Sequence, residues 1–130
     1  MYLVYVDTSC AAKVLLQETE TARIKKWLEE SGFTFVSSRL LETEIRRVAA
    51  REGIEQTAAT ALLARFDLFD VAQTAFRGAG MYPDPLVRSL DALHLTMAAL
   101  IGAQAMATYD DRMAEAAQQM GLAVVLPDAA

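Results

Sequence analysis

The sequence of 130 residues has almost none of the features that cross-link a protein or anchor it in a membrane. Its one cysteine, Cys10, excludes an internal disulfide and fits no zinc-ligand spacing. No apolar run approaches the ~20 residues that span a bilayer. The N-terminus lacks a basic segment followed by a long apolar one, so we expect no signal peptide and a cytoplasmic protein. Hydrophobic residues make up 54% of the chain, which predicts a folded domain with a core.

The sequence also has no excess of basic residues. The chain has 12 Lys and Arg against 17 Asp and Glu, a formal net charge of -5. This balance argues against a protein that coats nucleic acid by bulk charge. If a metal neutralised four acids, 13 acidic residues would face 12 basic ones. A local basic patch could then still guide a polyanion.

Short apolar segments alternate with amphipathic ones along the whole chain. We predict strands over residues 2–6, 33–36, 68–71, 105–108 and 123–126. Helices are predicted over 11–16, 21–30, 39–51, 54–65, 72–80, 90–101 and 112–120. Thr8 and Ser9 are expected to cap the first of these, Ser37 and Ser38 the helix over 39–51, and Ser89 the helix over 90–101. Alternation of this kind implies a parallel sheet. We therefore expect one α/β domain over residues 1–130, with a central parallel sheet of about four to five strands flanked by helices on both faces.

Four acidic residues stand where an acid is costly or lies next to a predicted strand end: Asp7, Glu44, Asp91 and Asp110. Asp7 ends the apolar run 2–6, and Asp91 lies in a helix that is apolar almost all round. A carboxylate in such a place is unfavourable unless a positive charge compensates it. Sites in parallel sheets form at the carboxyl ends of strands, where Asp7 and Asp110 fall. If the fold gathers all four, a divalent metal is the simplest compensation, and the chemistry is phosphoryl transfer or hydrolysis.

Each acid also has a purely structural explanation. Asp7 could cap a helix, but Thr8 and Ser9 can already do so, which favours the interpretation of Asp7 as a metal ligand. Asp91 could be a first-turn acid, an arrangement worth only ~0.3–1 kcal/mol. Of the adjacent Asp110 and Asp111, one is expected to cap the helix and the other to ligate the metal. The residues alone do not decide which acid has which role.

The helix over 39–51 carries two candidate acids. On a wheel of ~100° per residue, Glu44 lies ~60° from the apolar centre near Leu41, and Glu42 lies ~100° from it. Glu42 can pair with Arg46 on the surface. We therefore favour Glu44 as the acid that points toward the site.

Two further groups of residues have weaker indications. His94, the single histidine, lies one turn after Asp91; it is either catalytic or, as we favour, a satisfied core residue or orienting donor. Basic residues cluster on the helix over 39–51, and we predict a solvated face there. A secondary hypothesis is that Arg46 and Arg47 guide a phosphate. The apolar residues Trp27, Leu62, Leu63 and Phe66 fit either the core or an interface.

Four motifs in order resemble those of the PIN-domain ribonucleases, and within them the VapC-type toxins of toxin–antitoxin pairs. They are Tyr5-Val6-Asp7-Thr8-Ser9, the segment Ser38–Arg47 with Glu44, the segment Arg88–Leu95 with Asp91, and Ala107–Arg112 with Asp110. The resemblance covers nearly the whole chain. It implies a PIN-like α/β domain, bound Mg²⁺ or Mn²⁺, hydrolysis of RNA, a homodimer and a small antitoxin partner.

Read with this resemblance, the acids receive separate hypothetical roles. Asp7 and Asp91 ligate the main ion, Asp110 completes its shell, and Glu44 ligates a second ion or orients the attacking water. Oxygen ligands suit Mg²⁺ or Mn²⁺. Orienting roles are assigned to Thr8, Thr108, Asp111 and His94.

Two alternatives remain at this point. One is a non-catalytic PIN scaffold that binds RNA or a protein partner. The other is a phosphatase or receiver that forms an aspartyl phosphate on Asp7. The second alternative needs a lysine late in the chain, and the last lysine is Lys26.

Overall fold

The structure is a computed structural model, and it describes residues 1–127. Five parallel strands form one sheet in the order β3-β2-β1-β4-β5. The strands are β1 (Leu3–Val6), β2 (Thr34–Ser38), β3 (Asp67–Phe69), β4 (Ala105–Ala107) and β5 (Ala123–Val124). This arrangement confirms the predicted α/β fold with a parallel sheet. Several predicted strands are one or two residues too long.

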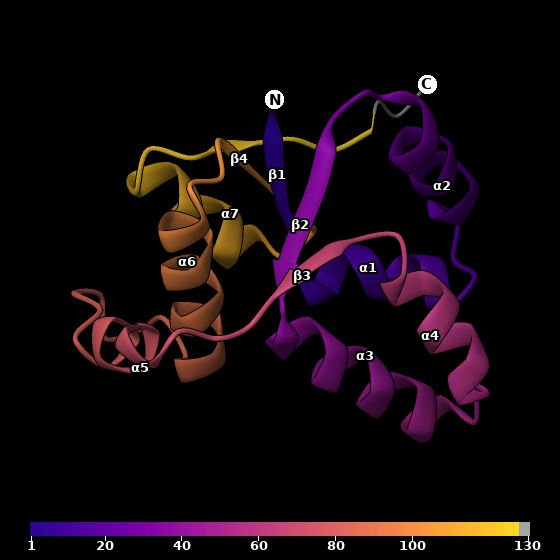
Figure 1. The fold of residues 1–130 in the computed structure, drawn as a ribbon, viewed down its shortest axis with the longest axis horizontal. Helices are drawn as coiled ribbons and strands as arrows, with labels where there is room; N and C mark the ends of the chain where they lie inside the picture. Colours follow the sequence, from indigo (N-terminus) through magenta and orange to yellow (C-terminus); the bar gives the residue numbers. More distant parts are fainter. Residues whose placement is uncertain (128–130) are drawn as a thin grey trace.

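Helices cover both faces of the sheet (Figure 1). On one side lie α1 (Thr8–Leu15), α2 (Thr21–Glu30), α3 (Arg39–Glu52) and α4 (Gln56–Leu63). On the other side lie α5 (Gln73–Gly80), α6 (Ser89–Ile101) and α7 (Asp111–Gln119). Over residues 1–127, no helix has the length and apolar character needed to cross a membrane.

The central strand β1 supplies side chains to two separate cores. Val4 and Val6 belong to the core beneath α1 to α4, whereas Tyr5 belongs to the core beneath α5 to α7. Successive side chains of a strand point to opposite faces, so a strand buried on both sides shows no polar alternation. This explains why the run over residues 2–6 is apolar without alternation. The four apolar residues left open between core and interface also pack with the first core: Trp27, Leu62, Leu63 and Phe66.

The starts of α3 and α6 differ from prediction. Ser38 occupies the N-cap position of α3, but its side chain makes no capping bond. The neighbouring Ser37 hydroxyl donates to the Val6 carbonyl at 2.8 Å. In α6 the N-cap is Arg88 and not Ser89. A serine side chain caps a helix only where no other acceptor or donor competes for it.

The helix α6 is also less enclosed than its composition suggests. Leu90 is 50% exposed and Leu100 is 55% exposed, so one side of the helix faces solvent. Asp91 is half-buried as a result, and the expectation of a deeply buried acid is wrong. The chain leaves α6 through Gly102, whose φ of +84° is strained for other residues. Three residues further on, Ala105 begins β4.

Candidate active site

Asp7 follows the last residue of β1 and is the N-cap of α1. Its side chain is only 3% exposed. The Oδ1 atom accepts hydrogen bonds from the Ser9 hydroxyl at 2.7 Å and from the Cys10 backbone N–H at 3.2 Å. The prediction that Thr8 and Ser9 cap this helix is therefore wrong. The carboxylate lies directly after the strand, and from there it reaches the free N–H of Cys10 in the first turn of the helix.

The second oxygen of Asp7 is held from the neighbouring strand. Thr108 follows β4, and its hydroxyl donates to Asp7 Oδ2 at 2.6 Å. The Ser9 and Thr108 hydroxyls are themselves 3.1 Å apart. Burial raises the pKa of Asp7, and the hydrogen bonds from Thr108, Ser9 and Cys10 oppose this shift. Removing the charge of Asp7 would therefore relieve a desolvation cost.

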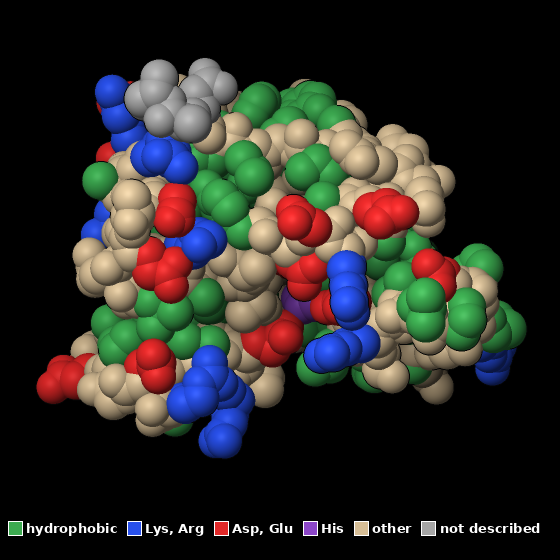
Figure 2. Space-filling view, turned by 180° about the vertical axis from the view of Figure 1, so that it is seen from behind, with side chains coloured by type: hydrophobic (Ala, Val, Ile, Leu, Met, Phe, Trp, Pro, Cys, Tyr) green, Lys and Arg blue, Asp and Glu red, His purple; other side chains and the backbone are tan. Residues whose placement is uncertain are grey.

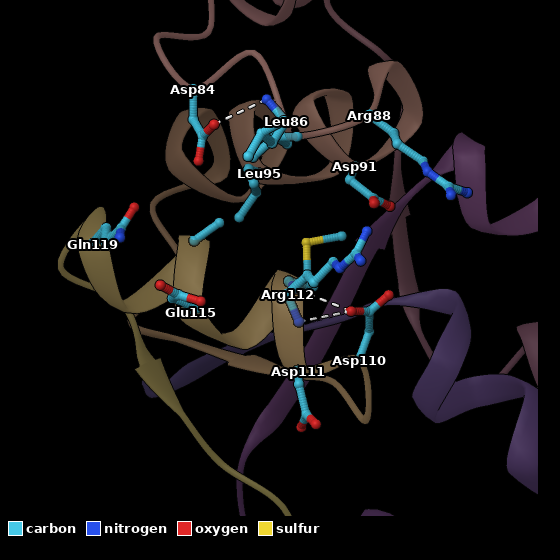
Figure 3. A pocket seen from close by; sticks show the side chains of 13 residues that line it. Asp84, Leu86, Arg88, Asp91, Leu95, Asp110, Asp111, Arg112, Glu115 and Gln119 are labelled. Atoms are coloured by element: carbon cyan, nitrogen blue, oxygen red, sulfur yellow. Dashed lines mark hydrogen bonds between the residues drawn. The ribbon is translucent and has the colours of Figure 1, made fainter.

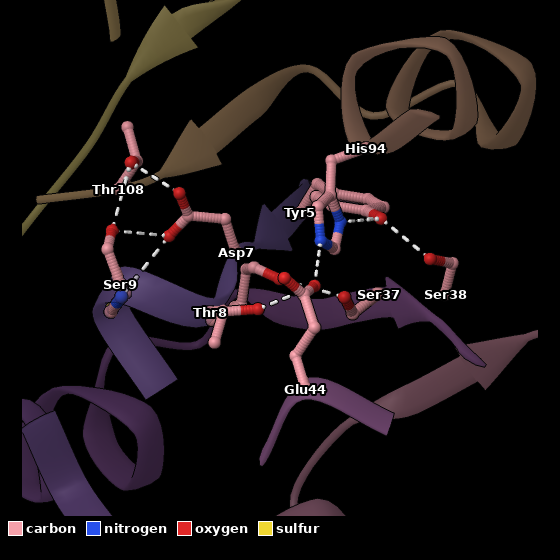
Figure 4. Close-up of polar contacts among 11 residues, drawn as sticks. Tyr5, Asp7, Thr8, Ser9, Ser37, Ser38, Glu44, His94 and Thr108 are labelled. Atoms are coloured by element: carbon pink, nitrogen blue, oxygen red, sulfur yellow. Dashed lines mark hydrogen bonds and ion pairs between the residues drawn. The ribbon is translucent and has the colours of Figure 1, made fainter. Parts of the chain in front are cut away.

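Glu44 lies on α3 and is held at one oxygen by two donors. Thr8 Oγ1 donates to Glu44 Oε1 at 2.9 Å, and His94 Nε2 lies 2.5 Å from the same oxygen (Figure 4). Burial acts to raise the pKa of Glu44, but the hydrogen bonds and charge interaction with His94 outweigh it and lower the pKa. Glu44 is thus kept ionised. The neighbouring Glu42 forms the predicted surface pair with Arg46, at 3.7 Å.

His94 is 2% exposed and is satisfied at both ring nitrogens, as we favoured from the sequence. Its Nδ1 lies 2.7 Å from the hydroxyl of Tyr5, which in turn lies 2.9 Å from the hydroxyl of Ser38. Burial raises the pKa of Tyr5 to about 12, so the phenol keeps its proton at neutral pH. These contacts lie on the side of Glu44 away from Asp7, between the sheet and α6 (Figure 4).

Asp91 and Asp110 line a groove between the segment leading into α6 and the helix α7 (Figure 3). The groove has a volume of about 850 Å³. Burial raises the pKa of Asp91, and the charge of Asp110 raises it further. His94 and Arg88 act in the opposite direction. A carboxylate whose pKa is raised by burial and by a neighbouring carboxylate lies where a cation would be stabilising.

The structure separates the adjacent acids Asp110 and Asp111. Asp110 is the N-cap of α7, and its Oδ1 accepts from the backbone N–H groups of Arg112 and Met113 at 2.9 Å and 3.2 Å. Asp111 is the first helical residue and is exposed. In Figure 3 its side chain points away from Asp91. Capping occupies only one oxygen of Asp110, so the same residue can cap and face the groove.

The four predicted acids lie around one end of the sheet. Thr8, next to Asp7, donates to Glu44, and His94 connects Glu44 with the turn that carries Asp91. Figure 2 shows acidic side chains gathered about the single histidine at a hollow in the surface. Within residues 1–127, no three His, Cys, Asp or Glu side chains form a group that could hold a metal ion. The fold therefore brings the acids into one neighbourhood without a ready-made coordination cage.

The arginines that line the groove are not the two considered from the sequence, Arg46 and Arg47. Arg46 donates to Gln56 and Thr60 of α4 at 3.1 Å each, so its guanidinium is already engaged there. Arg47 is exposed on α3. The groove itself is lined by Arg88 and Arg112. Both stand inside the third and fourth sequence motifs, and a search for basic residues within those motifs would have found them.

The sequence matches the PIN domain family over residues 4–119, and the chain belongs to that family. Ribonuclease VapC35 of Mycobacterium tuberculosis is 35% identical over 133 residues, which covers 96% of this chain and 97% of VapC35. Ribonuclease VapC46 of the same organism is 33% identical over 130 residues, covering 98% and 99% of the two chains. The resemblance to VapC-type PIN ribonucleases is thus confirmed.

A solved structure has the same fold despite low sequence identity. It is that of VapBC2 from Rickettsia felis bound to a DNA fragment from the promoter, with a TM-score of 0.73 and 14% identity. The match covers 97% of this chain and 99% of the other. The parallel sheet and its flanking helices are therefore shared over nearly the whole length.

Proposed function

We propose that the chain is a metal-dependent ribonuclease that hydrolyses RNA phosphodiester bonds as the toxin of a toxin–antitoxin pair. The observation that carries this proposal is the buried Asp7, fixed at the end of β1 beside Glu44, with Asp91 and Asp110 in the adjoining groove. Two relatives at 33–35% identity are named ribonucleases, which supports the same activity. We also propose that residues 1–130 form a single PIN-like domain.

The donor set fits a hard divalent cation. All four acids offer oxygen, which suits Mg²⁺ or Mn²⁺. Across residues 1–127, the hydrogen bonds leave four carboxylate oxygens without a protein donor, namely Glu44 Oε2, Asp110 Oδ2 and both oxygens of Asp91. Asp7 and Asp91 would hold the main ion, Asp110 would complete the set, and Glu44 would hold a second ion or orient the attacking water.

The protein's own groups prepare the site in advance. Thr108 and Ser9 fix Asp7, while Thr8 and His94 fix Glu44, so these two carboxylates are held in defined orientations. A bound Mg²⁺ would lower the pKa of a water molecule and offset the charge of the phosphate. Asp111 is left with no more than an indirect part, because its side chain points away from Asp91 (Figure 3).

Asp91→Asn is expected to lower the rate of RNA cleavage at least about 100-fold, because metal charge stabilisation is worth several kcal/mol and 1.36 kcal/mol is tenfold in rate. Cleavage of a labelled RNA by the purified variant, with Mg²⁺, with Mn²⁺ and with EDTA, measures this. Asp70→Asn, in the loop after β3, is the matched control and should retain full activity. Wild-type cleavage that continues undiminished in EDTA would refute the metal-dependent mechanism.

The groove gives the RNA strand a path past the acids. Arg88 and Arg112 line it, and one guanidinium group can donate two parallel hydrogen bonds to the oxygens of a phosphate. The apolar part of the groove includes Leu95 and Met113. We infer that a phosphate next to the scissile one contacts these arginines.

Arg112→Gln is expected to raise KM for RNA about tenfold with a smaller effect on kcat, since hydrogen bonds to charged groups contribute roughly 1.5–3 kcal/mol. The salt dependence of log KM should fall by about 0.7, the slope expected for one phosphate contact on a single strand. Arg51→Gln, exposed at the end of α3, is the control. An unchanged salt slope in Arg112→Gln would contradict the phosphate contact.

Association with other chains is the remaining part of the proposal. We propose a small antitoxin partner and a homodimer. Exposed apolar side chains on and next to α5 and α6 support association, because contiguous exposed apolar surface marks interaction sites. They are Phe76, Met81, Leu86, Leu90 and Leu100.

A non-catalytic PIN scaffold is the second candidate. The observation in its favour is that the acids of residues 1–127 form no group able to hold a metal without rearrangement. Titration calorimetry with Mg²⁺ or Mn²⁺ separates the two candidates, since a scaffold would show no binding. Membership of the PIN family leaves nothing in favour of an aspartyl-phosphate enzyme.

A further inference from the structure

A buried line of hydrogen bonds runs from the core to Glu44. Its members, in order, are Ser38 at the end of β2, Tyr5 in the middle of β1, His94 on α6 and Glu44 on α3 (Figure 4). Ser38 and Tyr5 are 0% exposed and His94 is 2% exposed. Solvent therefore has almost no access to the first three members, and both ring nitrogens of His94 are bonded within the line.

We propose that Tyr5 and Ser38 orient His94 so that its Nε2–H donates to Glu44 Oε1, which makes His94 a positioning residue for Glu44. The proposal deepens the proposed function, because its consequence for metal binding rests on Glu44 being part of the site. The hydrogen-bond arrangement itself can be tested without any assumption about activity.

The hydrogen on Nε2 follows from the partners available. An ionised carboxylate accepts hydrogen bonds and donates none. Glu44 Oε1 lies 2.5 Å from His94 Nε2, so this contact is a hydrogen bond only if Nε2 carries the hydrogen. The tautomer with a bare Nε2 would place two acceptors against each other in a buried site, which is unfavourable.

Two hydroxyl groups allow this donation in either protonation state of the ring. A hydroxyl can donate or accept. When the ring is neutral, Tyr5 donates to Nδ1 and Ser38 donates to Tyr5. When the ring is charged, Nδ1 donates to Tyr5 and Tyr5 donates to Ser38. A phenol and a serine hydroxyl therefore keep Nε2–H directed at Glu44, whereas a backbone carbonyl would accept only from a protonated Nδ1.

The geometry at Glu44 shows why this orientation matters. Thr8 Oγ1 and His94 Nε2 both bond Oε1, and they come from different elements, α1 and α6. Two donors on one oxygen fix the carboxylate plane and leave Oε2 free for a ligand. Partners that orient a ligating side chain typically change metal affinity 10–100-fold when removed.

The chain has one histidine, so the ring gives a single set of signals in a long-range ¹H–¹⁵N spectrum. At neutral pH we expect Nε2 to be protonated, with its hydrogen protected from exchange. A spectrum that shows a bare Nε2 and a protonated Nδ1 would overturn the proposal and leave the proposed function intact. Failure of wild-type protein to bind Mn²⁺ or cleave RNA would instead overturn the proposed function, while the tautomer would stand.

Two substitutions at His94 separate positioning from packing. In His94→Gln the side-chain amide nitrogen reaches about as far as Nε2 and can still donate to Glu44. In His94→Asn the amide reaches only about as far as Nδ1. Mn²⁺ affinity, measured from the electron paramagnetic resonance signal of the free ion, should fall about 10–100-fold in His94→Asn and less than about tenfold in His94→Gln. Equal losses in the two variants would overturn the positioning role.

Tyr5→Phe tests the other end of the line and keeps the aromatic ring in the core. It should weaken Mn²⁺ binding about tenfold and broaden or shift the His94 ring signals, because Nδ1 loses its partner. Tyr2→Phe is the matched control, since Tyr2 is 38% exposed and packs on Phe33. Wild-type affinity together with unchanged ring signals in Tyr5→Phe would overturn the part assigned to Tyr5 and Ser38.

Discussion

Asp7→Asn is expected to abolish RNA cleavage and, in metal-free solution, to leave a protein that is more stable to heat than wild type. The activity should fall at least about 100-fold, because the neutral amide loses the charge that holds a cation. The gain in stability has a separate cause, namely the desolvation of a carboxylate that is 3% exposed.

The helix cap survives the substitution. Asparagine caps a helix about as well as aspartate, and its carbonyl can accept from Cys10 N–H and the Ser9 hydroxyl as Asp7 Oδ1 does. The amide nitrogen would face Thr108, whose hydroxyl can accept as well as donate. We therefore expect Asp7→Asn to keep the local structure at the end of β1.

The pH dependence follows from the raised pKa of Asp7. Between the unfolded value of 3.8 and the higher folded value, the folded protein binds more protons than the unfolded chain. The free energy of unfolding contributed by Asp7 therefore falls as the pH rises through this window and stays low at neutral pH. Asp7→Asn removes this contribution, so its stability should depend less on pH.

Thermal unfolding in EDTA at several pH values, together with RNA cleavage in Mg²⁺, measures both effects. Asp67→Asn, an exposed residue at the start of β3, is the control. A variant that cleaves RNA at the wild-type rate would contradict the role of Asp7 in the site. A melting temperature below that of wild type at neutral pH would contradict the desolvation argument.

Leu41→Ala is expected to lower the free energy of unfolding by about 2–5 kcal/mol, a large share of the ~5–15 kcal/mol typical of a domain. Leu41 is 0% exposed and belongs to the core beneath α1 to α4, so truncation leaves a cavity. Leu100→Ala makes the same chemical change on α6 at a side chain that is 55% exposed. That control should change stability by no more than about 0.5 kcal/mol.

Equilibrium unfolding in urea compares the two variants. Activity provides a second measure, because Leu41 lies one turn before Glu44 on the same helix. We expect Leu41→Ala to reduce RNA cleavage as well, since α3 would hold Glu44 less firmly against Thr8. Equal stability losses in the two leucine variants would show that α3 is not packed as described.

Much of the fold was predictable because the relevant signals are local. All five strands and seven helices were predicted near their positions within residues 1–127. The choice of Glu44 over Glu42 also depended on helical geometry alone. The two side chains point in different directions as expected: Glu44 contacts His94, and Glu42 pairs with Arg39 and Arg46 on the surface. Periodicity within one element needs no knowledge of the rest of the chain.

Features that depend on distant neighbours were predicted less well. The sequence favoured Thr8 and Ser9 over Asp7 as caps, because no local pattern shows that the Ser9 hydroxyl bonds Asp7 and Thr108 instead. The depth of Asp91 was overestimated because α6 has an open side at Leu90 and Leu100. The sequence suggested Arg46 and Arg47 as the residues that guide a phosphate, and it did not indicate that Arg88 and Arg112 line the groove.

By itself the sequence determined the order of strands and helices, the apolar core positions and the acids worth considering, since each of these is encoded in short-range patterns. Only the tertiary structure decided which hydroxyls bond Asp7, that His94 links Tyr5 to Glu44, and that Asp91 and Asp110 share a groove with two arginines. These contacts join residues up to 101 positions apart. Such pairings depend on how the helices pack against the sheet, and no local pattern specifies that packing.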